Sequence, residues 1–186
     1  MNYCSDCGAK VSLTTPSDDN RARHVCDDCN MVHYSNPKNV TGAILFKGDK
    51  VLLCKRAIEP RYGLWTLPAG FMENEETVKQ GAARETYEEA QAKAKSLSFF
   101  GMFSLPHISQ VYMMYVGELE GNEYGAGPES LEVELFSKDE IPWDNLAFPV
   151  VKYCLERYFE KGYQADHVFE ASVTRLEDKT IQIKEE

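Results

Sequence analysis

Two pairs of cysteines near the start of the chain restrict its fold more than any other feature. Cys4 and Cys7 form one C-x2-C pair, Cys26 and Cys29 form a second, and 18 residues separate the pairs. This spacing is typical of a tetrahedral zinc site to which each pair supplies two thiolates. The segment has few large aliphatic residues, so zinc binding would supply most of its folding free energy. Because four thiolates leave no open coordination position, the Zn²⁺ site is predicted to be structural.

A change in composition at Asn36-Pro37 predicts a domain boundary. Residues 1–38 are rich in Cys, Asp, Asn and Ser, and we predict a small zinc ribbon there, with His24 and His33 at its surface. Residues 39–162 contain the apolar runs and are predicted to form the main domain. Residues 163–186 are expected to be a C-terminal extension, either with a strand at 168–173 or as a disordered tail.

The order of apolar runs in the main domain predicts a mixed α/β fold in which helices flank a sheet. A helix is expected over residues 78–92 with Thr77 as its N-cap, and a second from Pro149 to Gly162. Strands are expected at 40–46, 51–55, 64–67, 97–103, 111–118 and 131–136. The apolar stripe of the first helix is predicted to consist of Ala83, Thr86, Tyr87, Ala90 and Ala94.

Charge and hydropathy exclude several classes of protein. The net charge is −10, whereas a large nucleic-acid interface needs a field of Lys and Arg, so we expect no nucleic-acid partner. No run approaches the roughly 18 apolar residues of a membrane span, and the first residues lack the features of a signal peptide. We therefore expect a soluble cytoplasmic protein without a membrane partner.

Three glutamates lie close together on the first predicted helix. Glu85, Glu88 and Glu89 are neighbours at helical spacing, so their charges repel one another. A hard divalent cation with oxygen ligands, Mg²⁺ or Mn²⁺, would relieve this repulsion. Such a cation can neutralise a diphosphate and activate a water molecule. Helical spacing alone leaves a solvated acidic helix face as the alternative.

A longer pattern around these glutamates favours the metal site. The sequence reads Gly70-x5-Glu76-x7-Arg84-Glu85-Thr86-x-Glu88-Glu89, which resembles the Nudix box, G-x5-E-x7-R-E-U-x-E-E-x-G-U with U aliphatic. All polar positions match in register. The departures are Thr86 at an aliphatic position, Gln91 at the late glycine and Ala69 before the first glycine. None of these departures removes a carboxylate.

The resemblance to Nudix hydrolases implies an α/β/α sandwich with a mixed sheet, preceded by the zinc ribbon, and a metal-dependent hydrolysis of diphosphate linkages. It also implies that Glu76 and Arg84 pair to orient the loop and the helix. By resemblance, the metal ligands are Glu85, Glu88, Glu89 and the backbone of Gly70. A box glutamate or a glutamate from a distant loop serves as general base in this family, and the candidates here are Glu88, Glu89, Glu129 and Glu132.

A four-cysteine ribbon ahead of a Nudix box is similar to the subgroup that acts on FAD, ADP-ribose and related dinucleotides, as are residues 54–65 and 104–111. This implies cleavage of a nucleoside diphosphate-X compound into AMP and X-phosphate by a homodimer. NADH diphosphatase and nucleoside triphosphate cleanup are alternatives. An alternative of another class is a ligand-sensing Nudix regulator that binds nucleic acid through its ribbon.

Four residues are candidates for substrate binding. Arg56 and Arg61 are suited to phosphate contacts, with an equal expectation that they are surface charges. Trp65 is a candidate for stacking on a flat ring, as are Tyr62 and Phe103, although a core position is the stronger expectation for each aromatic. His107 is expected to contact either phosphate or ring.

Overall fold

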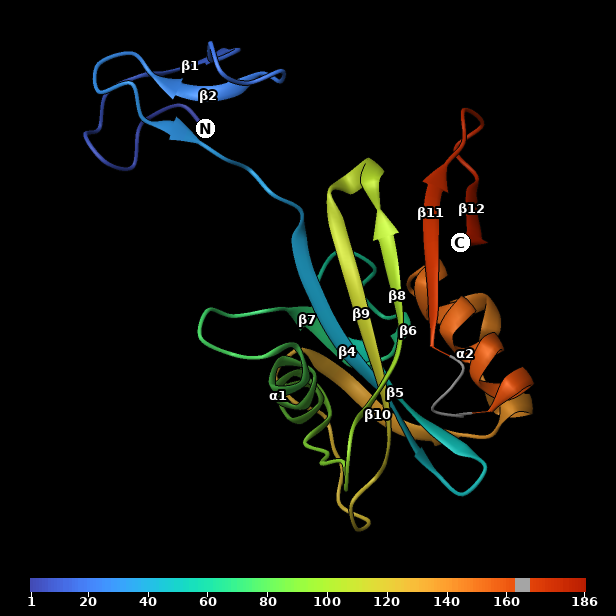
Figure 1. Ribbon diagram of the computed structural model, residues 1–186. Helices are drawn as coiled ribbons and strands as arrows, with labels where there is room; N and C mark the ends of the chain where they lie inside the picture. The colour runs from blue at the N-terminus through green and yellow to red at the C-terminus, as the bar shows by residue number, and fades with distance from the viewer. Residues whose placement is uncertain (163–167) are drawn as a thin grey trace. The chain divides into compact units, whose positions relative to one another are not determined.

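The computed structural model describes residues 1–162 and 168–186, and its contacts divide the chain into two units, Met1–Pro37 and Lys38–Glu186 (Figure 1). In the first unit, the strands β1 (Val11–Thr14), β2 (Arg23–Cys26) and β3 (Val32–His33) form an antiparallel sheet in that order. The buried side chains of this unit include Cys4 and Cys26 and no large aliphatic residue among those described. An interior of cysteines agrees with folding that depends on a metal.

The second unit contains one mixed sheet. Its strands are β4 (Lys38–Lys47), β5 (Lys50–Arg56), β6 (Trp65–Thr66), β7 (Ala69–Phe71), β8 (Ser98–Leu105), β9 (Gln110–Glu118), β10 (Ser130–Phe136), β11 (Phe169–Arg175) and β12 (Ile181–Glu185). The main path of the sheet runs β10-β5-β4-β9-β8-β11-β12, in which β4 pairs with β9 and β8 with β11 in parallel, while β6 pairs with β5 and β7 with β4. Short 3-10 turns are η1 (Pro106–Ile108), η2 (Lys138–Glu140) and η3 (Trp143–Asn145).

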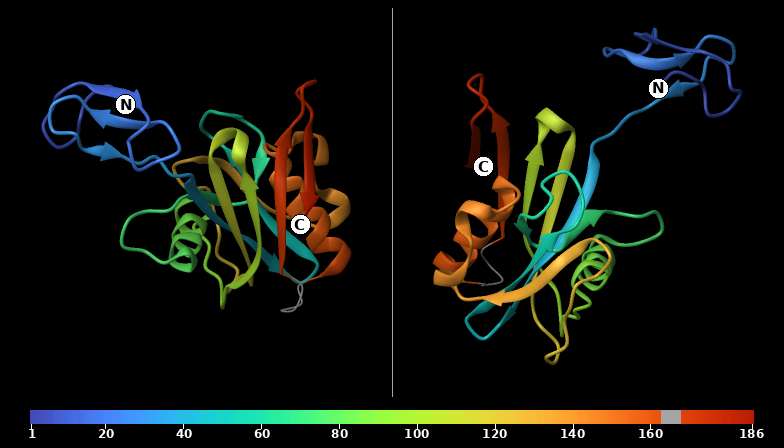
Figure 2. Two further views of the ribbon diagram at one scale, coloured as in Figure 1. Left: turned by 45° about the horizontal axis from the view of Figure 1, so that its top comes forward. Right: turned by 180° about the vertical axis from the view of Figure 1, so that it is seen from behind.

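Two helices cover opposite faces of this sheet, α1 (Val78–Ala90) and α2 (Pro149–Lys161), as Figure 2 shows. Alternation along β4 explains the two layers: Leu45 packs in the cluster that includes α1 residues, and Ile44 packs in the cluster that includes α2 residues. This arrangement confirms the predicted α/β/α sandwich. Across the described ranges, no helix combines the length and the apolar character needed to cross a membrane.

The start of α1 agrees with its prediction, but its buried face is rotated from the predicted one. Thr77 caps the helix through a capping box with Gln80. The buried residues are Gly81, Ala82, Glu85, Thr86, Glu89 and Ala90. The prediction that Ala83 and Tyr87 face the core is wrong, because both are exposed. Small residues on the buried face let the helix approach the sheet closely, and this approach buries two glutamates that pure amphipathicity would leave in water.

Helix α1 ends at Ala90, two residues before the predicted end. Gln91 adopts a left-handed conformation with φ 49° and ψ 25°, and its backbone N–H donates to the Tyr87 carbonyl. Its side-chain Nε2 donates to the Ala126 carbonyl at 3.1 Å. Gln91 thus provides the helix-terminating geometry that a glycine usually provides.

The C-terminal part of the chain continues the main sheet. Strand β11 pairs with β8 from Phe169 to Ser172, and β12 pairs with β11. Glu185 on β12 accepts from the Tyr153 hydroxyl at 2.6 Å and pairs with Arg157, both on α2. Of the two alternatives for this segment, the strand therefore holds for its described part, while residues 163–167 of the predicted extension lie outside the described residues.

Candidate active site

Helix α1 directs Glu85 and Glu89 towards the start of β7. Both carboxylates belong to buried residues, and the backbone N–H of Ala69 donates to Glu89 Oε2 at 3.2 Å. Gly70 lies so close to the Glu85 carboxylate that a Cβ at position 70 would collide with it. The glycine of the box therefore allows the backbone to reach the glutamates, and the structure brings Gly70, Glu85 and Glu89 together as the resemblance implied.

Arg84 connects the glutamates to the loop before the helix. Its Nε and Nη2 donate to the two Glu76 oxygens at 3.0 and 2.8 Å, and Nη2 also donates to the Phe71 carbonyl. Nη1 donates to Glu85 at 2.7 Å and to Glu88 at 2.9 Å. The guanidinium of Arg84 lowers the pKa of Glu76 to about 2. This two-point ion pair orients the loop and the helix relative to each other.

Burial raises the pKa values of two glutamates that face the cavity. Burial raises the pKa of Glu89 to about 8, an effect that the Ala69 N–H opposes and the charge of Glu85 reinforces. Burial also raises the pKa of Glu85, against the effect of Arg84. Carboxylates that are unfavourable when charged and that present oxygen atoms fit a hard divalent cation. Glu85, Glu88, Glu89 and the Gly70 carbonyl are the groups that would hold it.

The raised pKa of Glu89 predicts how the stability of the metal-free protein depends on pH. Its ordinary pKa of 4.5 applies to the unfolded chain, and the value of about 8 applies to the folded chain. The stabilising contribution is therefore complete below the unfolded value and is lost as the pH rises through the folded value. In buffer without Mg²⁺ or Mn²⁺, we expect Tm to fall between about pH 5 and about pH 8. Thermal melts of wild type and Glu89→Gln test this, and an equal fall in both would contradict it.

The cysteine cluster lies in the first unit. The Sγ atoms of Cys4 and Cys29 are 3.8 Å apart, and those of Cys7 and Cys26 are 3.4 Å apart. A tetrahedral zinc with Zn–S bonds of about 2.3 Å places its sulfurs about 3.8 Å from one another. The four side chains therefore fit a structural Zn²⁺. His33, predicted as a surface residue, is half-buried, and its Nε2 lies 3.3 Å from Cys4 Sγ.

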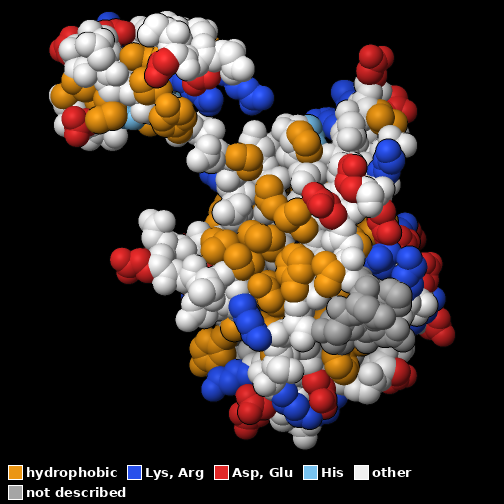
Figure 3. All heavy atoms as spheres, viewed as in Figure 1, with side chains coloured by type: hydrophobic (Ala, Val, Ile, Leu, Met, Phe, Trp, Pro, Cys, Tyr) orange, Lys and Arg blue, Asp and Glu red, His pale blue; other side chains and the backbone are white. Residues whose placement is uncertain are grey.

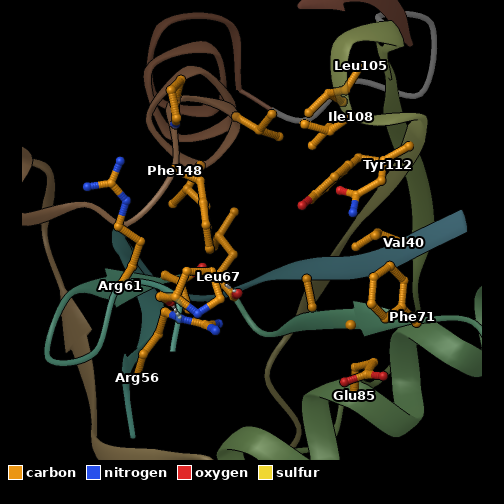
Figure 4. Close-up of a pocket in the computed structure, with 18 of the residues that line it drawn as sticks. Val40, Arg56, Arg61, Leu67, Phe71, Glu85, Leu105, Ile108, Tyr112 and Phe148 are labelled. Atoms are coloured by element: carbon orange, nitrogen blue, oxygen red, sulfur yellow. Dashed lines mark hydrogen bonds between the residues drawn. The ribbon is translucent and has the colours of Figure 1, made fainter. Parts of the chain in front are cut away.

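A cavity of about 1070 Å³ extends from the glutamates across the second unit. Figure 4 shows Glu85 at one side of it, with Arg56, Arg61 and Phe148 facing the same space. His107 and Glu129 also line it. The backbone N–H of Ala57 donates to the Glu129 carbonyl at 2.8 Å, which joins the segments of Arg56 and Glu129. Three of the four candidate binding residues therefore share one cavity with the glutamates.

Several candidate residues lie outside the cavity lining, namely Tyr62, Trp65, Glu76, Phe103 and Glu132. Trp65 packs in the core with its ring against Phe136, where the centroids are 4.9 Å apart. Glu132 lies on the exposed side of β10 and pairs with Lys55 at 2.8 Å. Strand alternation explains the positions of Trp65 and Glu132, because neighbouring residues on a strand point to opposite faces.

Two further residues contribute to the site that sequence patterns did not single out. Gly127 lies against the backbone of Glu88, where a Cβ would collide, and its N–H donates to the Glu89 carbonyl at 3.0 Å. Gln110 lines the cavity from β9. Gly127 lies in a segment that also contains Gly121 and Gly125, a composition typical of a loop that does not reveal the contact with the end of α1. Gln110 carried no signal in the sequence.

Comparison with known proteins shows the family to which this chain belongs. Residues 36–155 match the family described as NUDIX domain, and residues 2–35 match the family described as Nudix N-terminal, a zinc ribbon. The chain belongs to the Nudix family. It is therefore a Nudix hydrolase that carries a zinc ribbon ahead of its catalytic domain, as the resemblance implied, and a divalent metal is the cofactor of this family.

Two named relatives and one solved structure are similar to this chain. The chain is 33% identical over 121 residues to "ADP-ribose pyrophosphatase" of Methanocaldococcus jannaschii, covering 62% of this chain and 69% of that protein. It is 28% identical over 140 residues to "NAD-capped RNA hydrolase NudC" of Photobacterium profundum, covering 74% of this chain and 50% of that protein, so it spans about half the length of that relative. A NUDIX hydrolase structure from Nitrosomonas europaea superposes with a TM-score of 0.87 at 49% identity, covering 92% of this chain and 99% of that one.

Proposed function

We propose that this Nudix hydrolase cleaves the diphosphate linkage of a nucleoside diphosphate-X compound, ADP-ribose or FAD, into AMP and X-phosphate. The observation that carries the proposal is the position of Glu85 and Glu89 at one side of a large, mainly apolar cavity. Such a cavity suits a substrate that has a flat ring as well as a diphosphate. The names of two groups of relatives, ADP-ribose pyrophosphatase and NAD-capped RNA hydrolase, support the same class of linkage.

Separate groups of side chains in the cavity bind the metal, position the metal ligands and bind the substrate. Mg²⁺ or Mn²⁺, when bound by Glu85, Glu88, Glu89 and Gly70, would neutralise the diphosphate and lower the pKa of a water molecule. Arg84 and Glu76 hold the helix and loop that position those ligands. Arg56 and Arg61 bind the phosphates, and His107 contacts substrate at the far side of the cavity.

Among the candidate bases, we propose Glu129. It lines the cavity and is near enough to Glu85 and Glu89 to raise their pKa values. Within residues 1–162 and 168–186 its carboxylate has no ion-pair partner, whereas Glu88 pairs with Arg84 and Glu132 with Lys55. Its carboxylate is therefore free to accept a proton from the attacking water.

The variant Glu129→Gln should lower kcat by about a hundredfold or more, because general base catalysis is typically worth about 10²–10⁴-fold. The metal-induced rise in Tm should be unchanged, since Glu129 is not among the metal ligands. Steady-state kinetics and thermal melts with and without Mg²⁺ check both. Full activity in Glu129→Gln would contradict the assignment of Glu129 as the base. A loss in Glu88→Gln is expected in either case, because Glu88 is among the proposed metal ligands.

A screen with product identification tests the proposed activity. Purified protein with Mg²⁺ or Mn²⁺ is offered ADP-ribose, FAD, NADH and nucleoside triphosphates, and AMP plus X-phosphate is the expected product from ADP-ribose or FAD. Selective release of NMNH and AMP from NADH would favour the NADH diphosphatase alternative, and cleavage of triphosphates alone would favour cleanup. Binding of these compounds without turnover, combined with a mobility shift of duplex DNA, would favour the regulator.

A second copy of the chain is the assembly partner that we propose. Figure 3 shows apolar side chains gathered over β8 and β9. On β8 and β9, the sheet face opposite Tyr112 and Met114 carries the half-buried apolar residues Phe99, Met102, Val111, Met113 and Tyr115. A second copy would remove this surface from water. Sedimentation velocity checks the proposed dimer: a monomer at micromolar concentration would contradict it.

We also propose a cytoplasmic location. The four cysteines of the first unit are free of disulfides, which suits a reducing compartment.

A further inference from the structure

The cavity extends well beyond the glutamates. Figure 4 shows Leu105, Ile108 and Tyr112 on the opposite side of the space from Glu85. Val173 of β11 and Ile181 of β12 line the same cavity. The NUDIX domain match ends at residue 155, so the C-terminal hairpin is an addition of this chain beyond that match. It supplies part of the apolar wall.

One polar group among these apolar side chains has no partner. The Oε1 atom of Gln110 is buried and accepts no hydrogen bond from any described residue. Gln110 is the first residue of β9 and pairs through its backbone with Leu105 on β8, so its position in the wall is fixed by the sheet. A buried acceptor without a partner is unfavourable and is rare in native proteins. Its presence in a cavity wall indicates a donor that arrives with a ligand.

The amide of a glutamine accepts through its oxygen and donates through its nitrogen. This pair of groups matches a heterocycle edge that carries an N–H next to an acceptor, as the amino edge of adenine does. The imide edge of a flavin presents the same combination. An apolar slot with one amide at its wall is therefore suited to a flat nitrogen heterocycle.

We propose that the cavity end formed by Leu105, Ile108, Tyr112, Val173 and Ile181 binds the flat nitrogen heterocycle of the substrate, and that Gln110 recognises its N–H edge. The inference rests on the proposed function for the presence of a ring and a diphosphate in one molecule. Gln110 is a specificity-determining residue in this arrangement and takes no part in the bond cleavage.

Positive charge at the rim of the cavity favours a different occupant of this cavity end. Arg175 and Lys179 of the hairpin also line the cavity and are exposed. These side chains would favour a phosphate group instead of a ring. The buried position of the Gln110 oxygen argues for the ring, because a phosphate offers it no N–H donor and would bring a negative charge to an acceptor.

Calorimetric titration distinguishes the two occupants. AMP, FMN and ribose 5-phosphate are titrated with Mg²⁺ into wild type, Gln110→Leu and the matched control Gln182→Leu, since Gln182 lies outside the cavity lining. We expect AMP or FMN to bind wild type more tightly than ribose 5-phosphate. Gln110→Leu should weaken the ring-containing ligand by about tenfold, the value of one hydrogen bond of about 1.4 kcal/mol. Ribose 5-phosphate should be unaffected.

Three results would overturn the inference. They are equal binding of ribose 5-phosphate and both ring-containing ligands to wild type, no loss in Gln110→Leu, and the same loss for ribose 5-phosphate. The titration uses no turnover, so it is independent of the substrate screen. Absence of hydrolysis with intact ring recognition would overturn the proposed function alone.

Stability provides a second readout. Replacing the half-buried Gln110, whose buried amide oxygen has no partner among the described residues, with an apolar side chain of similar size should raise Tm by about 2–4 °C. Where ADP-ribose is cleaved, KM should rise about tenfold with kcat within about twofold of wild type, as expected for lost ground-state and transition-state binding alike. A fall in Tm in both Gln110→Leu and Gln110→Met would assign Gln110 a structural role and contradict the inference.

Discussion

The variant Glu89→Gln is expected to lose at least about a thousandfold in kcat while remaining folded, because it removes a charged ligand from the proposed metal site. Glu89 lies buried beside Ala69 and Glu85, so no water-exposed group replaces its charge. The amide keeps the size of the side chain and can still accept from the Ala69 N–H. Steady-state kinetics with saturating Mg²⁺ measures the loss.

The same variant has a thermodynamic signature that a damaged fold would not show. Because Gln carries no charge that burial disfavours, metal-free Glu89→Gln should melt at a higher temperature than wild type at about pH 8. Addition of Mg²⁺ should raise the Tm of wild type and leave the variant unchanged, since ligand binding stabilises only a protein that binds it. Glu134→Gln, an exposed glutamate outside the cavity, is the matched control. Wild-type turnover in Glu89→Gln would refute the metal-site assignment.

Removal of zinc is expected to unfold residues 1–37. Cys4 and Cys26 are the buried residues among those described in this unit, and zinc binding in comparable small modules contributes about 10–16 kcal/mol. Cys26→Ser removes one thiolate and should abolish stoichiometric zinc binding. Backbone amides of β1 and β2 should then exchange with solvent at close to unfolded rates. Hydrogen exchange read by mass spectrometry follows these peptides separately from those of the main sheet.

Metal analysis complements the exchange measurement. Wild type should contain one zinc per chain, and Cys26→Ser should contain much less. Cys154→Ala is the control because Cys154 is buried against the main sheet, away from the cluster, and should leave the zinc content unchanged. Protected amides in β1 and β2 without zinc would show that the ribbon folds by other means.

Local patterns predicted the elements that depend on neighbours in sequence. The capping box at Thr77 marked the start of α1, and the apolar runs at 40–46 and 51–55 marked strands β4 and β5, which are buried on both faces. The extent of α1 and its buried face were less predictable, because they depend on Gln91 adopting a left-handed conformation and on how closely Ala82 and Ala90 approach the sheet. Strands β7 and β12 were not predicted, and β11 was predicted only as one of two alternatives. Short or charged strands are stabilised mainly by their partners in the sheet, so local sequence patterns mark them weakly.

Spacing along the sequence by itself determined the cysteine cluster and the candidate metal ligands of helix α1. The C-x2-C pairs bring four Sγ atoms within 4.8 Å of one another, and the register from Gly70 to Glu89 lets the Gly70 backbone lie against the Glu85 carboxylate. Helical spacing of this kind is readable from sequence. Only the tertiary structure decided which other residues face the glutamates. It brought Arg56, Glu129 and Gln110 into one cavity and placed Trp65 and Glu132 elsewhere. These positions depend on strand pairing between distant segments, where a shift of one residue reverses the direction of every side chain.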